Sequence, residues 1–565
     1  MSEKMKRNGN SEMSPFLLRL LEARGIGASE ARDFLFPDYE RGIHDPFLFG
    51  GMRRAVERIL SAMERKERIA IYGDYDCDGI PGAVVLHDAL AKTGYENFRV
   101  YIPHRHKEGY GLNAEALKTL AAEGVRLIIT VDCGITDVRE VEEARKLGCD
   151  VIITDHHIPG DVLPAAEAIL NPKLPGDPYP EKMLSGAGVA WKLACALFSA
   201  GEERKAFSVP DGWEKWLLDM AGLATIADMV PLTGENRIIA RFGLVVLAKS
   251  PRPGLRKLCS LMRVSQERIT EDDVAFMIAP RINAASRMGV PFDAFRLLST
   301  RDEAEAARKA ELLHRMNDER KWTVAHIVKE AKKKIARRRD GSVIVVGDPR
   351  WRIGVLGIVA GNLCEEYGKP AFVWGREGDG DIKGSCRSDG SVDVVELLSS
   401  VTDGFFLDAG GHELSGGFSV SHERVHFLEE EIAAAYAKVR REKKENLFSP
   451  DLPLSLSDVS EDTYSDISLL APFGIGNPKP LFSFDNVSVA GVFPFGKEKN
   501  HIRVSFTGHG GARRDAIAFF AAEDSFSAPL REGERVRLIA SMEKTFFRGF
   551  PELRLRISDI LPPDA

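Results

Sequence analysis

The stretch IAIYGDYDCDG at residues 69–79 joins a short apolar run to three alternating aspartates. Two later stretches are built in the same way, LIITVDCG at residues 127–134 and VIITDHH at residues 151–157. Short runs rich in β-branched residues and bounded by glycine or polar residues are typical of buried parallel strands. The side chains that follow the three runs are acidic groups or imidazoles: Asp74, Asp76, Asp78, Asp132, Asp155, His156 and His157.

We expect the three runs to be strands of one α/β sheet. Parallel strands share their carboxyl edge, so side chains that are far apart in the sequence converge there. Carboxylates crowded together repel one another and are costly to desolvate unless a cation neutralises them. Oxygen ligands with one or two imidazoles suit Mn2+ or Mg2+. The sequence therefore predicts a hydrolytic metal site that binds its ions as a pair.

Each motif has a simpler interpretation when it is taken alone. A DxDxDG segment can be a calcium-binding loop, but that loop needs a Glu at its twelfth position. The twelfth residue counted from Asp74 is Val85. A single Asp at a strand end is more often a helix N-cap, and a His-His pair is usually a surface or core feature. Three such edges in succession favour the metal site.

The order of the motifs resembles the DHH phosphoesterase superfamily. Its four ordered segments correspond to DYDCDG, VDCG, DHH and ATIADMVPL, the last at residues 224–232 with Asp228. Within this superfamily the chain most resembles the RecJ family of bacterial single-strand-specific 5′→3′ DNA exonucleases, from about residue 35 to the end. The further motifs that carry the resemblance are EGYGLN (108–113), SGAGVAWKL (185–193), RINAASRM (281–288), GVLGIVAG (354–361), KGSCRS (383–388), GGH (410–412) and PFGIGNPKP (472–480).

The resemblance implies the metal ligands. They are Asp76, Asp78, Asp132, His156 and Asp228, around two Mn2+ or Mg2+ ions. Asp132 lies centrally among the motifs and is the best candidate to bridge the two ions. Asp74 and Asp155 are expected to orient these ligands rather than to bind the ions.

The resemblance also implies the groups that bind the substrate. Four residues are expected to contact the substrate phosphate and to stabilise its charge in the transition state. They are His157, Arg281, Asn283 and Arg287. The neighbouring backbone or a 5′ end is expected to be held by Ser385, Arg387 and His412. The expected catalytic residues are Asp132, His157 and Arg281.

The chain is expected to have two to four domains, because its 565 residues exceed what one hydrophobic core supports. Residues 1–45 are predicted to be an N-terminal cap segment. Strands at residues 69–73, 98–102, 126–131 and 151–154 alternate with helices, which predicts a parallel sheet in a DHH catalytic domain at residues 46–300. A helix is predicted at residues 213–227.

Three further parts are predicted after the catalytic domain. Residues 301–339 have the pattern of one long, charged connecting helix. A second α/β domain, DHHA1 by resemblance, is expected at residues 340–447. Short alternating strands with interleaved aromatic and basic residues predict an antiparallel β-barrel of the OB-fold type at residues 448–565.

The long helix ends in the basic sequence KKKIARRR at residues 332–339. One interpretation is favourable charge at a helix C-terminus together with ordinary solvation. The other is a surface that faces nucleic-acid phosphates, which would locally offset the acidic total. The sequence leaves both interpretations open.

The composition is that of an intracellular enzyme. The net charge of -7 argues against a generally basic nucleic-acid binder, so any phosphate-binding surface must be local. Seven cysteines without a CxxC pair fit a reduced compartment. The N-terminus lacks an apolar signal core, and no apolar stretch approaches membrane-spanning length. We therefore expect a cytoplasmic protein with no membrane contact.

Together with the metal-site motifs, the resemblance implies a metal-dependent exonuclease that degrades single-stranded DNA 5′→3′ to mononucleotides by two-metal-ion phosphodiester hydrolysis, in DNA repair and recombination. The polarity rests on the resemblance alone, as do the expected partners beyond single-stranded DNA, a single-strand-binding protein and a helicase. A DHH hydrolase of small substrates is disfavoured, because such a substrate needs no long helix or barrel. An inactive DNA-binding scaffold is disfavoured, because it has no need of costly clustered carboxylates.

Overall fold

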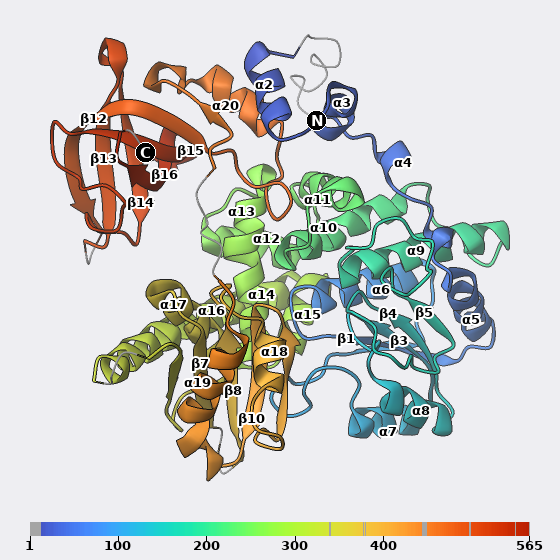
Figure 1. The fold of residues 1–565 in the computed structure, drawn as a ribbon. Coiled ribbons are helices and arrows are strands. Elements are labelled where there is room, and N and C mark those ends of the chain that lie inside the picture. Colours follow the sequence, from blue (N-terminus) through green and yellow to red (C-terminus); the bar gives the residue numbers. More distant parts are fainter. Residues whose placement is uncertain are drawn as a thin grey trace. The chain divides into compact units, whose positions relative to one another are not determined.

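A computed structural model of the protein describes residues 13–337, 341–376, 378, 380–442, 449–496, 499–547 and 550–563. The chain forms two compact units, whose elements are labelled in Figure 1. One unit contains Asp45–Val230 and Phe242–Glu445. The other contains Met1–His44, Pro231–Arg241 and Asn446–Ala565. In the described part of the chain, no helix is both long enough and apolar enough to span a membrane.

The larger unit contains a five-stranded sheet in the order β2-β1-β3-β4-β5, with every pair parallel. The four strands predicted from the apolar runs are present, each within one residue of its predicted bounds. The sheet has one further strand, β5, which the sequence does not predict. The strands are β1 (Arg68–Gly73), β2 (Phe98–Tyr101), β3 (Val125–Val131), β4 (Asp150–Thr154) and β5 (Ala168–Leu170).

Helices cover both faces of this sheet (Figure 1). On one face lie α7 (Ala114–Ala122) and α8 (Val138–Lys146), and on the other lie α5 (Met52–Glu64), α6 (Gly79–Lys92) and α9 (Gly186–Glu203). The helix predicted at residues 213–227 is divided into a 3-10 turn, η3 (Trp213–Leu217), and α10 (Leu218–Ala227). The other helical elements up to residue 299 are η2 (Pro46–Leu48), α11 (Gly234–Leu247), α12 (Pro253–Met262), η4 (Gln266–Arg268), α13 (Glu271–Asp273), the π-helix η5 (Val274–Ile278), α14 (Ala279–Met288) and α15 (Phe292–Ser299).

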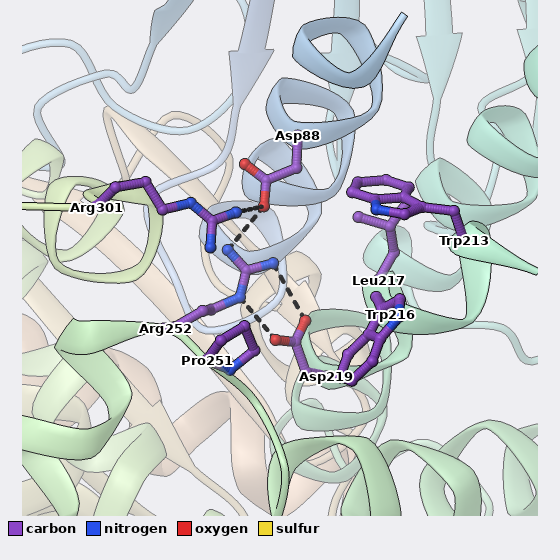
Figure 2. A pocket seen from close by; sticks show the side chains of 8 residues that line it. All are labelled: Asp88, Trp213, Trp216, Leu217, Asp219, Pro251, Arg252 and Arg301. Atoms are coloured by element: carbon purple, nitrogen blue, oxygen red, sulfur yellow. Dashed lines mark hydrogen bonds and ion pairs between the residues drawn. The ribbon is translucent and has the colours of Figure 1, made fainter. Parts of the chain in front are cut away.

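A buried ion-pair network connects α6 to α10 and α12 (Figure 2). Arg252, the N-cap of α12, is 4% exposed and lies 2.8 Å from Asp88 on α6 and 2.7 Å from Asp219 on α10. It also donates to the Leu298 carbonyl at 3.1 Å. Arg301, which is exposed, reaches Asp88 at 3.4 Å. Because α6 begins beside Asp78 and α10 ends beside Asp228, this network helps to set the positions of two predicted ligands.

The connecting helix α16 (Glu303–Ile335) is present as predicted but ends before residue 339, and Arg338 and Arg339 lie outside the described residues. It leads to a mixed sheet in the order β6-β7-β8-β10-β9. The strands are β6 (Ile344–Gly347), β7 (Ala371–Arg376), β8 (Ile382–Arg387), β9 (Asp408–His412) and β10 (Ser415–Val420). The helical elements are η6 (Ile353–Val355), α17 (Leu356–Tyr367), α18 (Val394–Ser399), η7 (Arg424–Phe427) and α19 (Leu428–Val439).

The smaller unit is the predicted barrel, closed because β12 pairs with both β13 and β15. Most of its strand pairs are antiparallel, whereas β14 and β16 pair in parallel. The strands are β11 (Leu452–Pro453), β12 (Phe482–Phe495), β13 (His501–Thr507), β14 (Arg513–Phe519), β15 (Arg535–Phe547) and β16 (Phe550–Leu561). The helical elements are α2 (Pro15–Ala23), α3 (Ala28–Leu35), α4 (Tyr39–Gly42), η8 (Leu456–Asp458), α20 (Glu461–Ser468) and η9 (His509–Gly511).

The N-terminal helices belong to the core of the barrel. Buried leucines of α2 and α3 share one hydrophobic cluster with the barrel phenylalanines: Leu17, Leu20, Leu21, Leu35, Phe482, Phe484 and Phe506. Residues 231–241 join the same unit, since Arg237 donates to the carbonyls of Phe34 and Pro472. The predicted fold class, a parallel α/β domain, a long helix, a second α/β domain and an OB-type barrel, is confirmed.

Candidate active site

The first three aspartates lie in the loop that joins β1 to α6. The Asp76 carboxylate accepts hydrogen bonds from the backbone N–H groups of Asp78 at 2.7 Å and Gly79 at 3.2 Å. The Asp78 carboxylate accepts from the first two N–H groups of α9, those of Gly186 at 2.6 Å and Ala187 at 2.7 Å. A helix N-terminus favours such a negative charge. These hydrogen bonds fix the second half of the aspartate motif, from Asp76 to Gly79.

The ends of β3 and β4 bring the other predicted ligands to the same edge. His156 Nε2 lies 3.2 Å from Asp132 Oδ1 and 3.6 Å from Asp78 Oδ2. The same nitrogen lies 3.7 Å from Asp228 Oδ2, at the C-cap of α10. The convergence predicted from the carboxyl edge of the sheet is confirmed for Asp78, Asp132 and His156, and Asp228 approaches them from the end of α10.

Three groups of side chains place their ligand atoms within 4.8 Å of one another, so each could hold a metal ion. All five predicted metal ligands belong to these groups. Asp74 and His157, to which the sequence assigns other roles, belong to them as well. The groups are Asp132, His156 and His157; Asp78, His156 and Asp228; and Asp74, Asp76 and Asp132.

The donor atoms fit divalent cations. One carboxylate oxygen each of Asp74 and Asp132 is buried and accepts no hydrogen bond from a described residue. Buried polar atoms rarely remain unpaired, so each such atom requires a partner. Oxygen and imidazole donors in this proportion are the ligands that Mn2+ and Mg2+ accept.

The pKa shifts of the clustered carboxylates and of His156 also indicate a site for a cation. Burial, and then the charges of neighbouring carboxylates, raise the pKa of Asp132 well above its usual range. The same causes raise the pKa of Asp78 to about 7 and that of Asp228 to about 9. Burial lowers the pKa of His156 to about 3, which keeps its imidazole neutral as a metal ligand must be. Without a cation, these carboxylates are driven to bind protons.

Asp155 makes hydrogen bonds that orient the two histidines. Its Oδ1 accepts from the backbone N–H groups of His156 at 2.7 Å and His157 at 3.1 Å. It also lies 2.8 Å from Nδ1 of His157. Burial opposes protonation of His157, but this hydrogen bond and the Asp155 charge raise the pKa of His157 overall. The other oxygen of Asp155 accepts from the Ile135 N–H at 3.0 Å.

The predicted phosphate-binding residues of RINAASRM lie on α14. Arg287 donates to the Gly354 carbonyl at 3.1 Å. Burial, and then the charges of Arg105 and Arg320, lower the pKa of Arg287 to about 9, while Asp76 opposes this shift. Arg287 therefore lies within electrostatic range of the acidic cluster and among other arginines.

The other two residues of this motif differ in their contacts. Arg281 Nε donates to His314 on α16 at 3.1 Å, and its Nη1 donates to the Met277 carbonyl at 2.7 Å. The side-chain oxygen of Asn283 is buried and accepts no hydrogen bond from a described residue. Asn283 thus has an open acceptor, whereas Arg281 is partly occupied by α16.

The predicted residues of the second domain share one face of its sheet. Arg387 on β8 lies opposite Ser415 on β10, which in turn lies opposite His412 on β9. Ser385 precedes Arg387 by two residues and so lies on the same face. The positive charge of Arg387 contributes to lowering the pKa of Arg287 on α14. This face of the sheet and α14 are therefore within electrostatic range of each other. His412 is exposed on the edge strand, and among the described residues no hydrogen bond or ion pair joins it to the acidic cluster.

Comparisons with known proteins match this organisation. Residues 68–225 match the DHH family N-terminal domain, residues 340–444 the DHHA1 domain, and residues 450–559 the RecJ OB domain. The single-stranded-DNA-specific exonuclease RecJ of Bacillus subtilis is 36% identical over 97% of this chain and 68% of that protein. The same enzyme of Escherichia coli is 31% identical over 98% of this chain and 96% of that protein. The chain belongs to the RecJ family.

Solved structures of a RecJ protein have the same fold as this chain. RecJ from Thermus thermophilus in complex with Mn2+ matches with a TM-score of 0.80 and 29% identity, over 98% of this chain and 76% of that one. The Mg2+ complex of the same protein matches with a TM-score of 0.75 and 27% identity, over 98% of this chain and 75% of that one. Both ions are those for which the donor set of this chain is suited.

Two residues of this RecJ-family site were missed from the sequence. The Tyr110 hydroxyl donates to the Asp132 carbonyl at 3.1 Å and lies 3.0 Å from His157 Nδ1. Tyr110 lies in the motif EGYGLN between Gly109 and Gly111, and these two flanking glycines were the available sequence signal. Both glycines have positive φ. Arg105 lies 4.9 Å from the Tyr75 ring, and no sequence feature distinguishes it from other arginines.

Proposed function

We propose that the protein is a metal-dependent exonuclease that hydrolyses single-stranded DNA from the 5′ end to mononucleotides. The observation that carries this proposal is the convergence of the buried carboxylates and His156 at one sheet edge, in a RecJ-family chain. The 5′ polarity and the mononucleotide product come from the resemblance to this family. The proposed domains keep the predicted bounds: 1–45, 46–300, 301–339, 340–447 and 448–565.

The proposed cofactor is a pair of Mn2+ or Mg2+ ions held by Asp76, Asp78, Asp132, His156 and Asp228. When bound, divalent cations neutralise the phosphate, lower the pKa of water and stabilise the leaving oxygen. Asp132 is the proposed bridging ligand, because among the carboxylates of these groups it alone belongs to two, and a carboxylate has two oxygens with which to bind two ions. Asp74 shares one of those groups, but its proposed role remains to orient the loop, together with Asp155.

The arginines beside the cluster are proposed to bind the phosphate backbone. Arg281, Arg287 and His157 would contact the scissile phosphate and stabilise the charge that develops in the transition state. Asn283 would donate a hydrogen bond from its side-chain amide nitrogen to the phosphate, since phosphate oxygens only accept. Ser385, Arg387 and His412 would hold the adjacent backbone or the 5′ end, where guanidinium forks suit phosphate oxygens.

The barrel offers a second surface of suitable chemistry. A hollow of about 480 Å3 on it is lined by four arginines, two carboxylates and three other side chains: Arg503, Arg513, Arg514, Arg554, Asp515, Glu552, Phe493, Ser505 and Leu553. The Arg503 guanidinium lies 5.0 Å from the centre of the Phe493 ring. Cations that pair with phosphates beside an aromatic ring on which a base can stack are typical of single-strand binding by OB-folds. We propose that this surface holds the strand.

The proposed biological role is DNA repair and recombination, in the cytoplasm, with a single-strand-binding protein and a helicase as partners. This role rests on membership of the RecJ family. Single-strand selectivity has a physical reason as well, since paired bases cannot stack on aromatic side chains.

The function is tested with end-labelled oligonucleotides in Mn2+, in Mg2+ and in EDTA. We expect single strands to be degraded from the 5′ end in either metal and to stay intact in EDTA. A blunt duplex should resist digestion, and a 5′ single-stranded tail should be removed up to the junction. Equal rates on duplex and single strand, or a requirement for a free 3′ end, would contradict the proposal.

A further inference from the structure

The solvent-facing side of α16 carries an unusual residue at its centre. Trp322 is 67% exposed, although it lies opposite the buried Leu313, Val324 and Ile327 on the same helix. Its ring stacks on that of His326, with centroids 5.2 Å apart and planes 10° apart. A large apolar side chain on the outermost line of a helix gains nothing from the protein core. A single exposed hydrophobic residue is common on a protein surface, so the case for a binding surface depends on the residues around Trp322.

His326 and two lysines follow Trp322 on the same line of the helix, and His326 lies 3.6 Å from Glu330. An α-helix turns about 100° per residue, so Trp322, His326, Lys329 and Lys333 follow one line along the axis. We call these four residues the Trp322 stripe. Its eleven steps extend over about 16 Å, at about 1.5 Å per residue.

The lysines of the stripe differ from those beside it. Lys332 pairs with Glu366 at 2.5 Å, and Lys334 pairs with Asp348 at 2.8 Å. Within the described part of the chain, Lys329 and Lys333 have no carboxylate partner. Favourable charge at the helix C-terminus explains cations in the last turn, but Lys329 lies before that turn.

We propose that the Trp322 stripe is a second binding site for single-stranded DNA, separate from the catalytic residues. Unpaired lysines can neutralise phosphates and release counterions, and an exposed indole can stack on an unpaired base. An acidic protein segment would match the lysines but would make no specific use of the open indole face. The inference rests on the proposed function, because it assigns to this surface a further part of the same substrate.

The test uses the full-length protein and phosphorothioate oligonucleotides of 8 and 40 nucleotides, which resist cleavage during binding measurements. Trp322→Ala should weaken binding of the 40-mer at least about 5-fold, the lower end expected for one lost stacking contact, and Trp322→Phe should restore most of it. The hydrolysis rate on an unmodified 8-mer should stay unchanged, because a strand this short is held by the catalytic residues.

A matched pair of double variants separates the stripe from net charge. Lys329→Ala/Lys333→Ala should lower the slope of log affinity against log salt by about 1.4, at about 0.7 per phosphate contact. Arg139→Ala/Arg145→Ala removes the same charge from the exposed surface of α8, on a different helix, and should leave the slope unchanged.

Two results would overturn the inference while leaving the proposed function intact. One is unchanged 40-mer affinity in Trp322→Ala, the result expected if the stripe instead binds a protein. The other is an equal change of slope in both double variants. Failure of the unaltered protein to degrade any single strand would instead refute the proposed function.

Discussion

Asp132 adopts a backbone conformation that few residues other than glycine adopt. Its φ is 62°, in the left-handed region, which costs an L-residue about 1–2 kcal/mol. Two hydrogen bonds hold it there, from its own N–H to the Thr154 carbonyl at 2.9 Å and from Tyr110 to its carbonyl at 3.1 Å. Strain that the surroundings maintain in this way is common at functional sites. This backbone conformation directs the Asp132 carboxylate so that it belongs to two of the three groups of ligand atoms.

The first prediction follows from this position. Asp132→Ala should lower turnover roughly 10³-fold or more, because several kcal/mol of charge stabilisation depend on the ions. Single-strand binding should stay nearly unchanged, because the arginines that face the phosphates remain. Mn2+ should raise the melting temperature of the unaltered protein much more than that of the variant. Near-normal hydrolysis by the variant would disprove the bridging role.

The second prediction concerns pH in the metal-free protein. The folded state raises the pKa of Asp228 from its ordinary 3.8 to about 9, through burial and then the charges of Asp78 and Asp76. The folded state therefore binds this proton more tightly than the unfolded chain. That stabilisation is complete below about pH 4 and is lost as the pH rises through about 9.

Asp228→Asn isolates this effect, since an amide does not titrate. In EDTA, the free energy of unfolding of the unaltered protein relative to the variant should fall steadily between about pH 5 and pH 9. Mn2+ should reverse the fall, because the ion replaces the proton. Urea denaturation at a series of pH values measures it, and a constant difference across this range would contradict the prediction.

The sequence predicts residues whose role follows from position along a strand. Asp132 and His156 follow apolar runs, so their convergence at one sheet edge can be deduced from the order of the runs alone. Arg105 and Tyr110 cannot be found in this way. They lie in an irregular loop whose path depends on tertiary contacts, and no periodic pattern marks them.

At the scale of elements, the start of α9 places two of the aspartates. Its first N–H groups bind Asp78, and Gly186 lies against Asp132. A Cβ at Gly186 would lie 2.6 Å from the Asp132 Cβ, so only glycine fits there. Gly186 of the motif SGAGVAWKL is therefore required for the close approach of α9 to Asp132.

The third prediction tests this close approach. Gly186→Ala should lower turnover roughly 10–100-fold, because a displacement of about 1 Å in a reacting group has this effect. Gly361→Ala in α17 is the matched control, since a Cβ there meets nothing within 4 Å. It should leave turnover unchanged and stabilise the helix by about 0.5–1 kcal/mol. Equal kinetics in the two variants would refute the role of Gly186.

The fourth prediction concerns the network in Figure 2. Arg252→Met leaves two buried carboxylates, Asp88 and Asp219, without their shared cation. The free energy of unfolding should fall by about 3–5 kcal/mol, the usual result of breaking a buried pair. Arg301→Ala removes an exposed partner of Asp88 at 3.4 Å and should cost at most about 1 kcal/mol. Denaturant unfolding compares them, and similar losses would show that Arg252 is not the central cation.

Helices and strands with a strong sequence pattern were predicted, and those with a weak pattern were missed. The apolar runs at β1, β3 and β4 are long enough to show buried strands, whereas the three residues of β5 carry no pattern. The division of residues 213–227 into η3 and α10 also left no signal, because both parts have helical apolar spacing.

At the scale of the whole molecule, the smaller unit is assembled from three separate parts of the chain. Arg237 is 2% exposed and donates to carbonyls on both sides of this assembly, at Phe34 and Pro472. Linear composition cannot reveal this arrangement, because it depends on contacts between residues more than 200 positions apart. A single cut in the chain therefore cannot separate the two units.

The fifth prediction uses this division to separate binding from catalysis. A variant ending near Leu447, a residue outside the described part of the chain, would lose the barrel but keep α2 and α3. Leu17, Leu20 and Leu21, which the barrel buries, would then be exposed to water, so we expect this variant to aggregate. A fragment of residues 45–442 removes these helices too, and it retains every proposed metal ligand.

The fragment should cleave an 8-mer at nearly the normal rate but bind long strands more weakly. Its affinity should also fall less steeply with salt, by about 0.7 in slope for each phosphate that the barrel arginines neutralise. Circular dichroism first establishes that the fragment is folded, and affinities against salt are then measured for it and for the full chain. Identical affinities and slopes would show that the barrel does not bind DNA. Its exposed arginines and aromatic rings would then be better explained by docking of a protein partner.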